Sequence, residues 1–320
     1  MRYVVTGLLV VCGALASGGA GAQSYPNRAV RLLVPFPPGG PADILGRIYA
    51  QKMGEEFGQQ VIVDNRPGAN TIIAAEAASK SAPDGYTLLM AIDSTLAMNP
   101  TLYTKLPYDP IKDFAPVGLI AMVPGVLVVH PSFPANTVQE MIAQAKAKPT
   151  QVNFAAGTIT MHVGAELLNK MAGIKMTPVF YKGGNTGITA LIANEIPVSY
   201  EGVAAALPHI RSGKARALGV MGAKRLAQLP DVPTIAESGV PGYDVFVWQS
   251  IVVRAGTPRE IIDRLNASLT RIARLPETRE RLSAAGIEPL ASTPEELAAH
   301  IRSETTKWSA VIKEIGLKVE

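Results

Sequence analysis

Strand-like and helix-like segments alternate along most of this chain. From Ala29 to Ile92 the order is strand, helix, strand, helix, strand, and a second series of the same kind begins near Thr137. A helix between two strands usually lays them side by side in parallel, so the pattern predicts parallel sheets covered by helices. The expected strands are 29–34, 60–64, 86–92, 152–156, 177–181, 196–200 and 215–220, and the expected helices are 41–57, 71–80, 161–171, 186–195, 258–274 and 294–315.

A long strand-like stretch, DVFVWQSIVVRAGTP, follows the second series. It is too long to end with the second unit, so we interpret it as a hinge strand that returns to the first. Ligands of open α/β sheets bind at the carboxyl ends of the strands, which places a cleft between the two units. Trp248 and Phe246 either pack in the hinge or form one wall of that cleft. The predicted domains are 23–122 with 246–320, and 123–245.

The first 22 residues read as a secretory signal peptide. They begin with one Arg, continue through a short apolar stretch and end in Ala20-Gly21-Ala22. The alternative, a membrane anchor, is weaker because Gly and Ser dilute a core that is already short. The only cysteine, Cys12, lies in this segment, so the mature chain would have no disulfide or thiolate metal site. We therefore expect an exported protein that is soluble after cleavage.

Composition excludes several classes of function. The chain has 320 residues, of which 48% are hydrophobic and 18% charged, enough for two domains with ordinary cores. The net charge of +4 comes from interspersed residues, without a Lys/Arg block. Nucleic-acid binding is therefore not expected, although a weak positive field would help to collect small anions.

The segment PFPPGGPAD, residues 35–43, joins the first strand to the first helix. Its glycines allow close backbone approach, Gly40 can precede the helix, and Pro41 suits the first helical position. Free N–H groups at a helix N-terminus favour an anion. Neither glycine-rich nucleotide motif is present, and a tight turn without a ligand remains the alternative. Asp43 either compensates the helix dipole or meets an amino or protonated group.

A second strand-to-helix turn occurs in NFAAGTITMHVGAELL, residues 153–168. Here Gly157, two threonines and His162 precede an apolar-periodic helix. Two such turns that face each other across a cleft could hold a carboxylate between them. His162 and Glu166 stand four residues apart and could share a metal, but a supporting or capping role is favoured because no third ligand is near. No cofactor or metal is expected.

Three helix starts carry capping signals. Thr137, Thr257 and Thr293 each precede a Glu by three residues, and the last two are followed by Pro at the first helical position. These signals predict helix boundaries and carry no function.

Ordered motifs from about Tyr25 to the C-terminus resemble a known family. They include YPNRAVRLLVPFPPGGPADILGR, VDNRPGAN, SAPDGYTLLM, FYKGGNTGITALIANEI and LPDVPTIAESGVPGY. The chain is similar to the extracytoplasmic solute-binding receptors of tripartite tricarboxylate transporters, called Bug proteins. The resemblance implies a monomeric, type II-like periplasmic binding protein that closes around a small carboxylate and delivers it to membrane transporter subunits.

The resemblance also implies which residues contact the ligand, through backbone N–H groups, hydroxyls and waters. From the first turn these are Phe36, Pro38, Gly39, Gly40, Ala42 and Asp43. From the second turn they are Ala156, Gly157, Thr158, Thr160 and His162. Tyr181 and Glu201 match later strand-end positions, and Ser94 is a further candidate.

Some positions depart from the family pattern. Ile159 replaces a second Gly, Ala156 stands where Ser is common, and Ala190 replaces a common acidic residue. These departures put a second carboxylate site in question, and a less polar pocket would suit an aromatic or monocarboxylate ligand. Dicarboxylate, aromatic and other carboxylic acids all stay open as ligands. Two other functions stay open: presentation of the ligand to a sensor kinase, and hydrolysis by Thr158 or Thr160 beside His162. The hydrolase is disfavoured because no orienting acid is evident.

Overall fold

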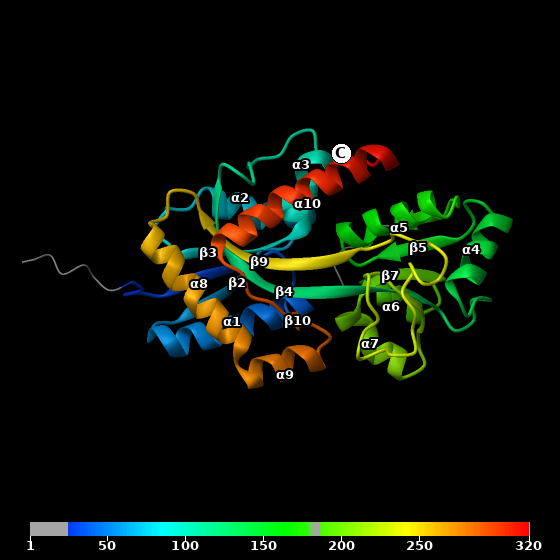
Figure 1. The fold of residues 1–320 in the computed structure, drawn as a ribbon, viewed down its shortest axis with the longest axis horizontal. Coiled ribbons are helices and arrows are strands. Elements are labelled where there is room, and N and C mark those ends of the chain that lie inside the picture. Colours follow the sequence, from blue (N-terminus) through cyan, green and yellow to red (C-terminus); the bar gives the residue numbers. More distant parts are fainter. Residues whose placement is uncertain (1–24, 180, 182–185, 320) are drawn as a thin grey trace, which may run out of the picture.

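Two α/β lobes lie side by side in the computed structural model, which describes residues 25–179, 181 and 186–319 (Figure 1). Two long strands run between the lobes and join them. This confirms the predicted fold class, two Rossmann-like units connected by a hinge. The proposed signal peptide, residues 1–22, lies outside the described residues.

The first lobe is built on three parallel strands. β1 pairs with both β2 and β3, and β3 pairs in the antiparallel direction with β9 (Phe246–Arg254). Apolar residues of β1 and β3 are fully buried because helices cover both faces of this sheet. The elements are β1 (Val30–Val34), α1 (Pro41–Phe57), β2 (Val61–Asn65), a 3₁₀ turn (Ala69–Thr71), α2 (Ile72–Ser79), β3 (Thr87–Ile92), a π-helix (Ser94–Met98) and α3 (Asn99–Leu102).

The second lobe repeats this plan. β5 pairs in parallel with β6 and β7, and β7 pairs in the antiparallel direction with β4 (Phe114–Val129). Its elements are α4 (Val138–Ala147), β5 (Asn153–Ala156), α5 (Ile159–Met171), β6 (Thr177–Val179), α6 (Thr186–Ile192), β7 (Val198–Gly202), α7 (Val203–Arg211) and β8 (Arg216–Val220).

The strand β4 (Phe114–Val129) belongs to both lobes. Its residues up to Pro124 pair with β9 (Phe246–Arg254), and its residues from Gly125 onward pair with β7 and β8. Proline has no N–H for a ladder bond, so the change of partner occurs where the ladder is already interrupted. A Cβ on Gly125 would lie 2.6 Å from Met221 Sδ and 3.0 Å from Met161 Sδ. Glycine therefore allows the close approach at this crossing.

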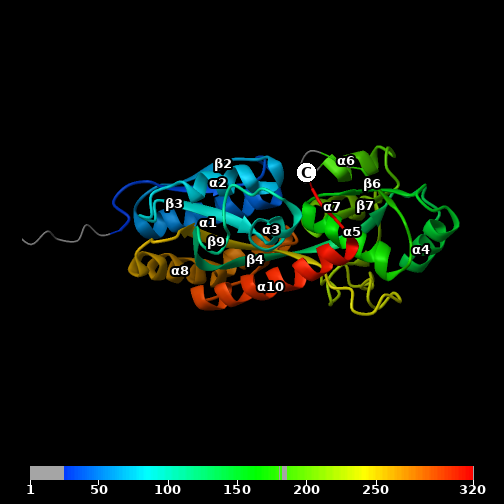
Figure 2. The same ribbon diagram turned by 90° about the horizontal axis from the view of Figure 1, so that it is seen from above.

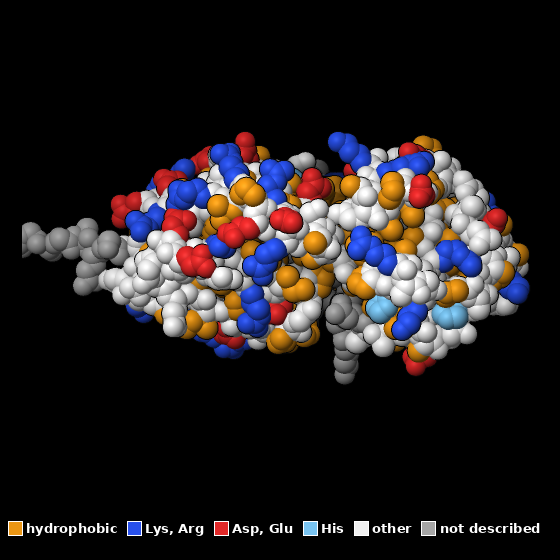
Figure 3. All heavy atoms as spheres, turned by 90° about the horizontal axis from the view of Figure 1, so that it is seen from below, with side chains coloured by type: hydrophobic (Ala, Val, Ile, Leu, Met, Phe, Trp, Pro, Cys, Tyr) orange, Lys and Arg blue, Asp and Glu red, His pale blue; other side chains and the backbone are white. Residues whose placement is uncertain are grey.

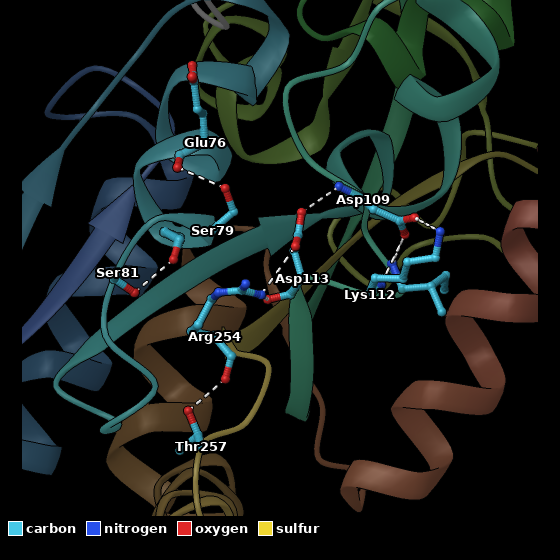
Figure 4. Close-up of polar contacts among 10 residues, drawn as sticks. Glu76, Ser79, Ser81, Asp109, Lys112, Asp113, Arg254 and Thr257 are labelled. Carbon is cyan, nitrogen blue, oxygen red and sulfur yellow. Dashed lines mark hydrogen bonds and ion pairs between the residues drawn. The ribbon is translucent and has the colours of Figure 1, made fainter.

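Polar contacts anchor the far ends of β4 and β9 in the first lobe (Figure 4). Arg254 Nη1 donates to Asp113 O at 2.8 Å and lies 3.2 Å from Asp113 Oδ1. Asp113 Oδ2 accepts from Asp109 N at 2.8 Å, and Thr257 Oγ1 donates to Arg254 O at 2.7 Å. Both strands are thus fixed at one end in the first lobe, and β4 continues into the sheet of the second lobe.

The C-terminal segment returns to the first lobe and then extends along the joining strands. Its elements are α8 (Arg259–Arg274), α9 (Pro276–Ala284), β10 (Glu288–Pro289) and α10 (Pro294–Ile315). Helix α10 runs along both lobes and contacts α5 of the second (Figure 2). Glu304 Oε2 accepts from the indole nitrogens of Trp308 at 2.8 Å and Trp248 at 3.3 Å. The two tryptophans of the chain therefore report on this junction.

The sequence predicted most elements within two residues. The bounds of α1 and α10 are as expected, and Thr137 and Thr293 cap their helices with side-chain bonds to Glu140 N and Glu296 N. The expected cap at Thr257 was wrong. Pro258 precedes α8 instead, and the Thr257 hydroxyl is bound to Arg254 O. The expected parallel pairs are present in both lobes, and β4 and β9 add antiparallel pairs that make the sheets mixed.

None of the described helices is both long enough and apolar enough to cross a lipid bilayer. On the face shown in Figure 3, Lys and Arg side chains are spread over both lobes.

Candidate ligand-binding site

A cavity of about 280 Å³ is bordered by both lobes. The first lobe and the joining strands contribute Phe36, Pro37, Pro38, Gly40, Pro41, Ala42, Ile92, Val123, Val247 and Gln249. The second lobe contributes Gly157, Thr158, Met161, Thr186, Gly202 and Ala205. Both strand-to-helix turns singled out in the sequence therefore meet at one cavity.

The first turn is held in shape by the carboxylate of Asp43. Asp43 Oδ2 accepts from Gly39 N at 2.9 Å and Arg47 Nε at 2.8 Å, and Oδ1 accepts from Asn65 Nδ2 at 2.9 Å. The same Asn65 nitrogen donates to Phe36 O at 3.0 Å. Burial alone would raise the pKa of Asp43, but the bonds from Arg47, Gly39 and Asn65 outweigh it and lower the pKa. The residue is thus ionised at neutral pH and stabilises the turn, and its expected contact with a ligand stays a prediction.

The second turn is held by Thr158 and the β5–β7 ladder. Thr158 Oγ1 accepts from Met161 N at 3.3 Å and caps α5, and Gly157 N donates to Tyr200 O at 2.9 Å. The first N–H groups of a helix have no partner inside the helix. With the Met161 N–H satisfied by the cap, the N–H groups of Ile159 and Thr160 are the ones without a partner inside α5.

Three helices begin at the cavity. Gly40 precedes α1, Thr158 precedes α5 and Gly202 precedes α7, and each borders the cavity. Neither α1 nor α7 has a side-chain cap, so its first N–H groups are left for a ligand. Helix N-termini carry partial positive charge, and no Asp or Glu is among the described residues that border the cavity. The electrostatics suit a small anion.

Six of the residues expected to contact a ligand border this cavity. They are Phe36, Pro38, Gly40, Ala42, Gly157 and Thr158. Gly39 and Ala156 lie next to them in the chain. Gly39 has φ +84° and donates its N–H to Asp43, which leaves that group unavailable to a ligand. Asp43 is buried and acts through the turn, as described above.

Thr160 and Ser94 lie at the junction of the lobes, outside the cavity lining. Both are fully buried, and the Ser94 hydroxyl has no hydrogen-bond partner among the described residues. They lie close to Asp93, which follows β3 and whose two carboxylate oxygens are likewise buried. Burial raises the pKa of Asp93 to about 8, and the neighbouring Thr160 hydroxyl and Ser94 N–H offset this only in part. The carboxyl group is therefore largely protonated at neutral pH.

Asp93→Asn is expected to stabilise the protein at alkaline pH. Between the ordinary Asp pKa near 4 and about 8, the folded protein keeps a proton that the unfolded chain has lost. The stability of the wild type therefore falls as pH rises through this window, whereas the neutral amide is insensitive to pH. Thermal unfolding at pH 5, 7 and 9 checks this.

The melting temperature of Asp93→Asn relative to wild type should rise with pH, whereas the exposed control Asp263→Asn should show no such trend. A constant difference across the range would contradict a buried, protonated Asp93.

His162, Tyr181 and Glu201 also lie outside the cavity lining. His162 Nε2 lies 3.6 Å from Glu166 Oε1, and its ring packs near Phe154. Tyr181 packs against the smaller apolar cluster of the second lobe. Glu201 Oε1 accepts from Ser199 Oγ at 2.6 Å, and burial raises the pKa of Glu201 to about 8. The expected contacts from these residues to a ligand stay predictions.

Sequence reasoning missed the walls of the cavity. Ile92, Val123, Val247 and Gln249 come from strands whose apolar pattern predicts burial but not which side faces a ligand. Met161 and Ala205 occupy helix positions that read as core. Only Gln249 carried a usable signal, as a polar side chain inside the apolar stretch VFVWQSIVV.

The family model described as "Tripartite tricarboxylate transporter family receptor" matches residues 45–317. The chain belongs to this family. It is 34% identical to protein BugT of Bordetella pertussis over 319 residues, which is 99% of this chain and 98% of that protein.

Solved structures of similar receptors share the fold. A structure of an R. palustris protein with adipate has a TM-score of 0.88 and 34% identity, covering 92% of this chain and 99% of that one. MatC from Rhodopseudomonas palustris with bound malate has a TM-score of 0.84 and 30% identity, covering 90% and 100%. The family and these neighbours are substrate-binding receptors.

Proposed function

We propose that this protein is a periplasmic receptor that binds one small organic carboxylate between its lobes and delivers it to the membrane subunits of a tripartite tricarboxylate transporter. The observation that carries the proposal is the meeting of three helix N-termini at one cavity free of described acidic side chains. The family membership and the adipate and malate bound by similar receptors support it.

In this proposal residues 23–122 with 246–320 and residues 123–245 are the two domains. The chain crosses between them where β4 exchanges β9 for β7 and β8. We take the arrangement of lobes seen here as the ligand-holding one, because both turns border the same cavity. The carboxylate would sit against the N–H groups of Ala42, Ile159 and Thr160, and opening about the two strands would release it.

Export through a cleaved signal peptide would place the receptor in the periplasm. The test uses the protein from Gln23 onward and thermal unfolding with mono-, di-, tri- and aromatic carboxylic acids. A ligand at 100 times its Kd stabilises a folded protein by about 2.7 kcal/mol. One class of acid should raise the melting temperature, whereas the matching amides should not. Absence of a shift with every acid would contradict the proposal.

A further inference from the structure

We propose that the ligand is a monocarboxylic acid with an otherwise apolar body that carries one hydroxyl group, and that Gln249 recognises this hydroxyl. The inference rests on the proposed function. It adds the chemistry of the part of the ligand that lies beyond the carboxylate.

The cavity walls beyond the helix ends are apolar. Phe36, Ile92 and Val123 stand on the side of the first lobe and the joining strands, and Met161 stands on the side of the second lobe. Such a lining favours burial of hydrocarbon in rough proportion to its area.

A second carboxylate would meet no cationic side chain along these walls. Among the described residues, those that border the cavity include no Lys, Arg or His. Arg47, on α1 after the first turn, is paired with Asp43 at 2.8 Å. An ionised group moved from water into an apolar space without a partner is strongly disfavoured. Beyond the helix N-termini, the described walls therefore disfavour a second carboxylate.

Gln249 places one amide group in this apolar wall. It lies on β9 between Ile92 of β3 and Ala121 of β4, and only 3% of it is exposed. Its Oε1 has no hydrogen-bond partner among the described residues. By contrast, the hydroxyl of Thr158, which also borders the cavity, already caps α5. A buried acceptor without a donor is costly, so a ligand that supplies a donor gains affinity.

A hydroxyl fits this amide better than a carboxylate does. A hydroxyl can donate to Oε1 and also accept from the amide nitrogen, whereas an ionised carboxylate only accepts. The Gln249 side chain therefore distinguishes the two groups by hydrogen-bond direction as well as by charge.

The test measures Kd by calorimetry for hexanoate, 6-hydroxyhexanoate and adipate, which share a six-carbon chain and differ at the far end. The series 4-methylbenzoate, 4-(hydroxymethyl)benzoate and terephthalate repeats the comparison on a rigid body. In the series that fits the cavity, the hydroxy acid should bind about tenfold more tightly than the methyl compound, as expected for one hydrogen bond. It should bind at least about a hundredfold more tightly than the diacid.

Gln249→Leu should abolish the preference for the hydroxy acid over the methyl compound, whereas Gln51→Leu on the exposed face of α1 should keep it. If a diacid binds most tightly, or if the hydroxyl preference survives in Gln249→Leu, the inference is overturned while the receptor function stands. If no carboxylate in either series or in the wider panel binds, the proposed function itself fails. The wild-type series decides the ligand class even if the variant does not fold.

Discussion

Gly286→Ala is expected to raise the Kd for the ligand at least about tenfold. Gly286 follows α9 in the first lobe, with φ +74°. A Cβ there would lie 2.9 Å from Val203 Cγ1 and 3.2 Å from Ala204 N, both at the start of α7 in the second lobe. The methyl group would therefore push the lobes apart in the ligand-holding arrangement, and each 1.4 kcal/mol of added cost weakens binding tenfold.

Gly58→Ala is the matched control for this variant. Gly58 ends α1 with φ +65°, and a Cβ there would meet nothing within 4 Å. Both variants carry the strain of a side chain in the left-handed region, about 1 kcal/mol. Only Gly286→Ala adds a contact between the lobes. Calorimetry should show an unchanged Kd for Gly58→Ala, and an equally unchanged Kd for Gly286→Ala would mean that this lobe contact is absent from the bound state.

Asp43→Ala is expected to lower the free energy of unfolding by about 2–4 kcal/mol and to weaken ligand binding about tenfold or more. The carboxylate binds Gly39 N, Arg47 and Asn65, and its loss leaves the first turn without its central acceptor. Because Gly40 and Ala42 of that turn border the cavity, the disordered turn would no longer present its N–H groups. Denaturant unfolding and calorimetry measure the two effects.

Asp263→Ala serves as the comparison for Asp43→Ala. Asp263 also pairs with an Arg four residues away, Arg259, but both side chains are more than half exposed. Exposed pairs contribute only about 0.2–1 kcal/mol, so this variant should change stability little and binding not at all. If Asp43→Ala behaves in the same way, Asp43 does not organise the turn.

Local patterns predicted the turns and most helices because their determinants are close in sequence. Pro41 begins α1, and Gly58, in the left-handed backbone conformation, follows its last residue. The complete capping box at Thr293 begins α10. Thr257 failed as a cap because its hydroxyl donates instead to the carbonyl of Arg254, three residues earlier at the end of β9. A capping signal in the sequence therefore predicts a helix start only where no nearby carbonyl competes for the hydroxyl of the capping residue.

The missing parts of the site depend on contacts between distant segments. β4 was not predicted as one strand because Pro124-Gly125 reads as a break, and the structure uses that break to exchange strand partners. Asp93 and Gln249 acquire their environments through the pairing of β3 with β9 and the packing of α10, which no local pattern reveals. The two turns were predictable, whereas the residues that hold the first turn, Arg47 and Asn65, and the walls of the cavity were not.

The most direct test of the account is the electron density of the mature protein crystallised with the acid that gives the largest thermal shift. The account predicts a carboxylate between the N-termini of α1 and α5, within hydrogen-bond distance of Ala42 N and Ile159 or Thr160 N. A ligand whose carboxylate lies elsewhere, or that is held by only one lobe, would contradict it.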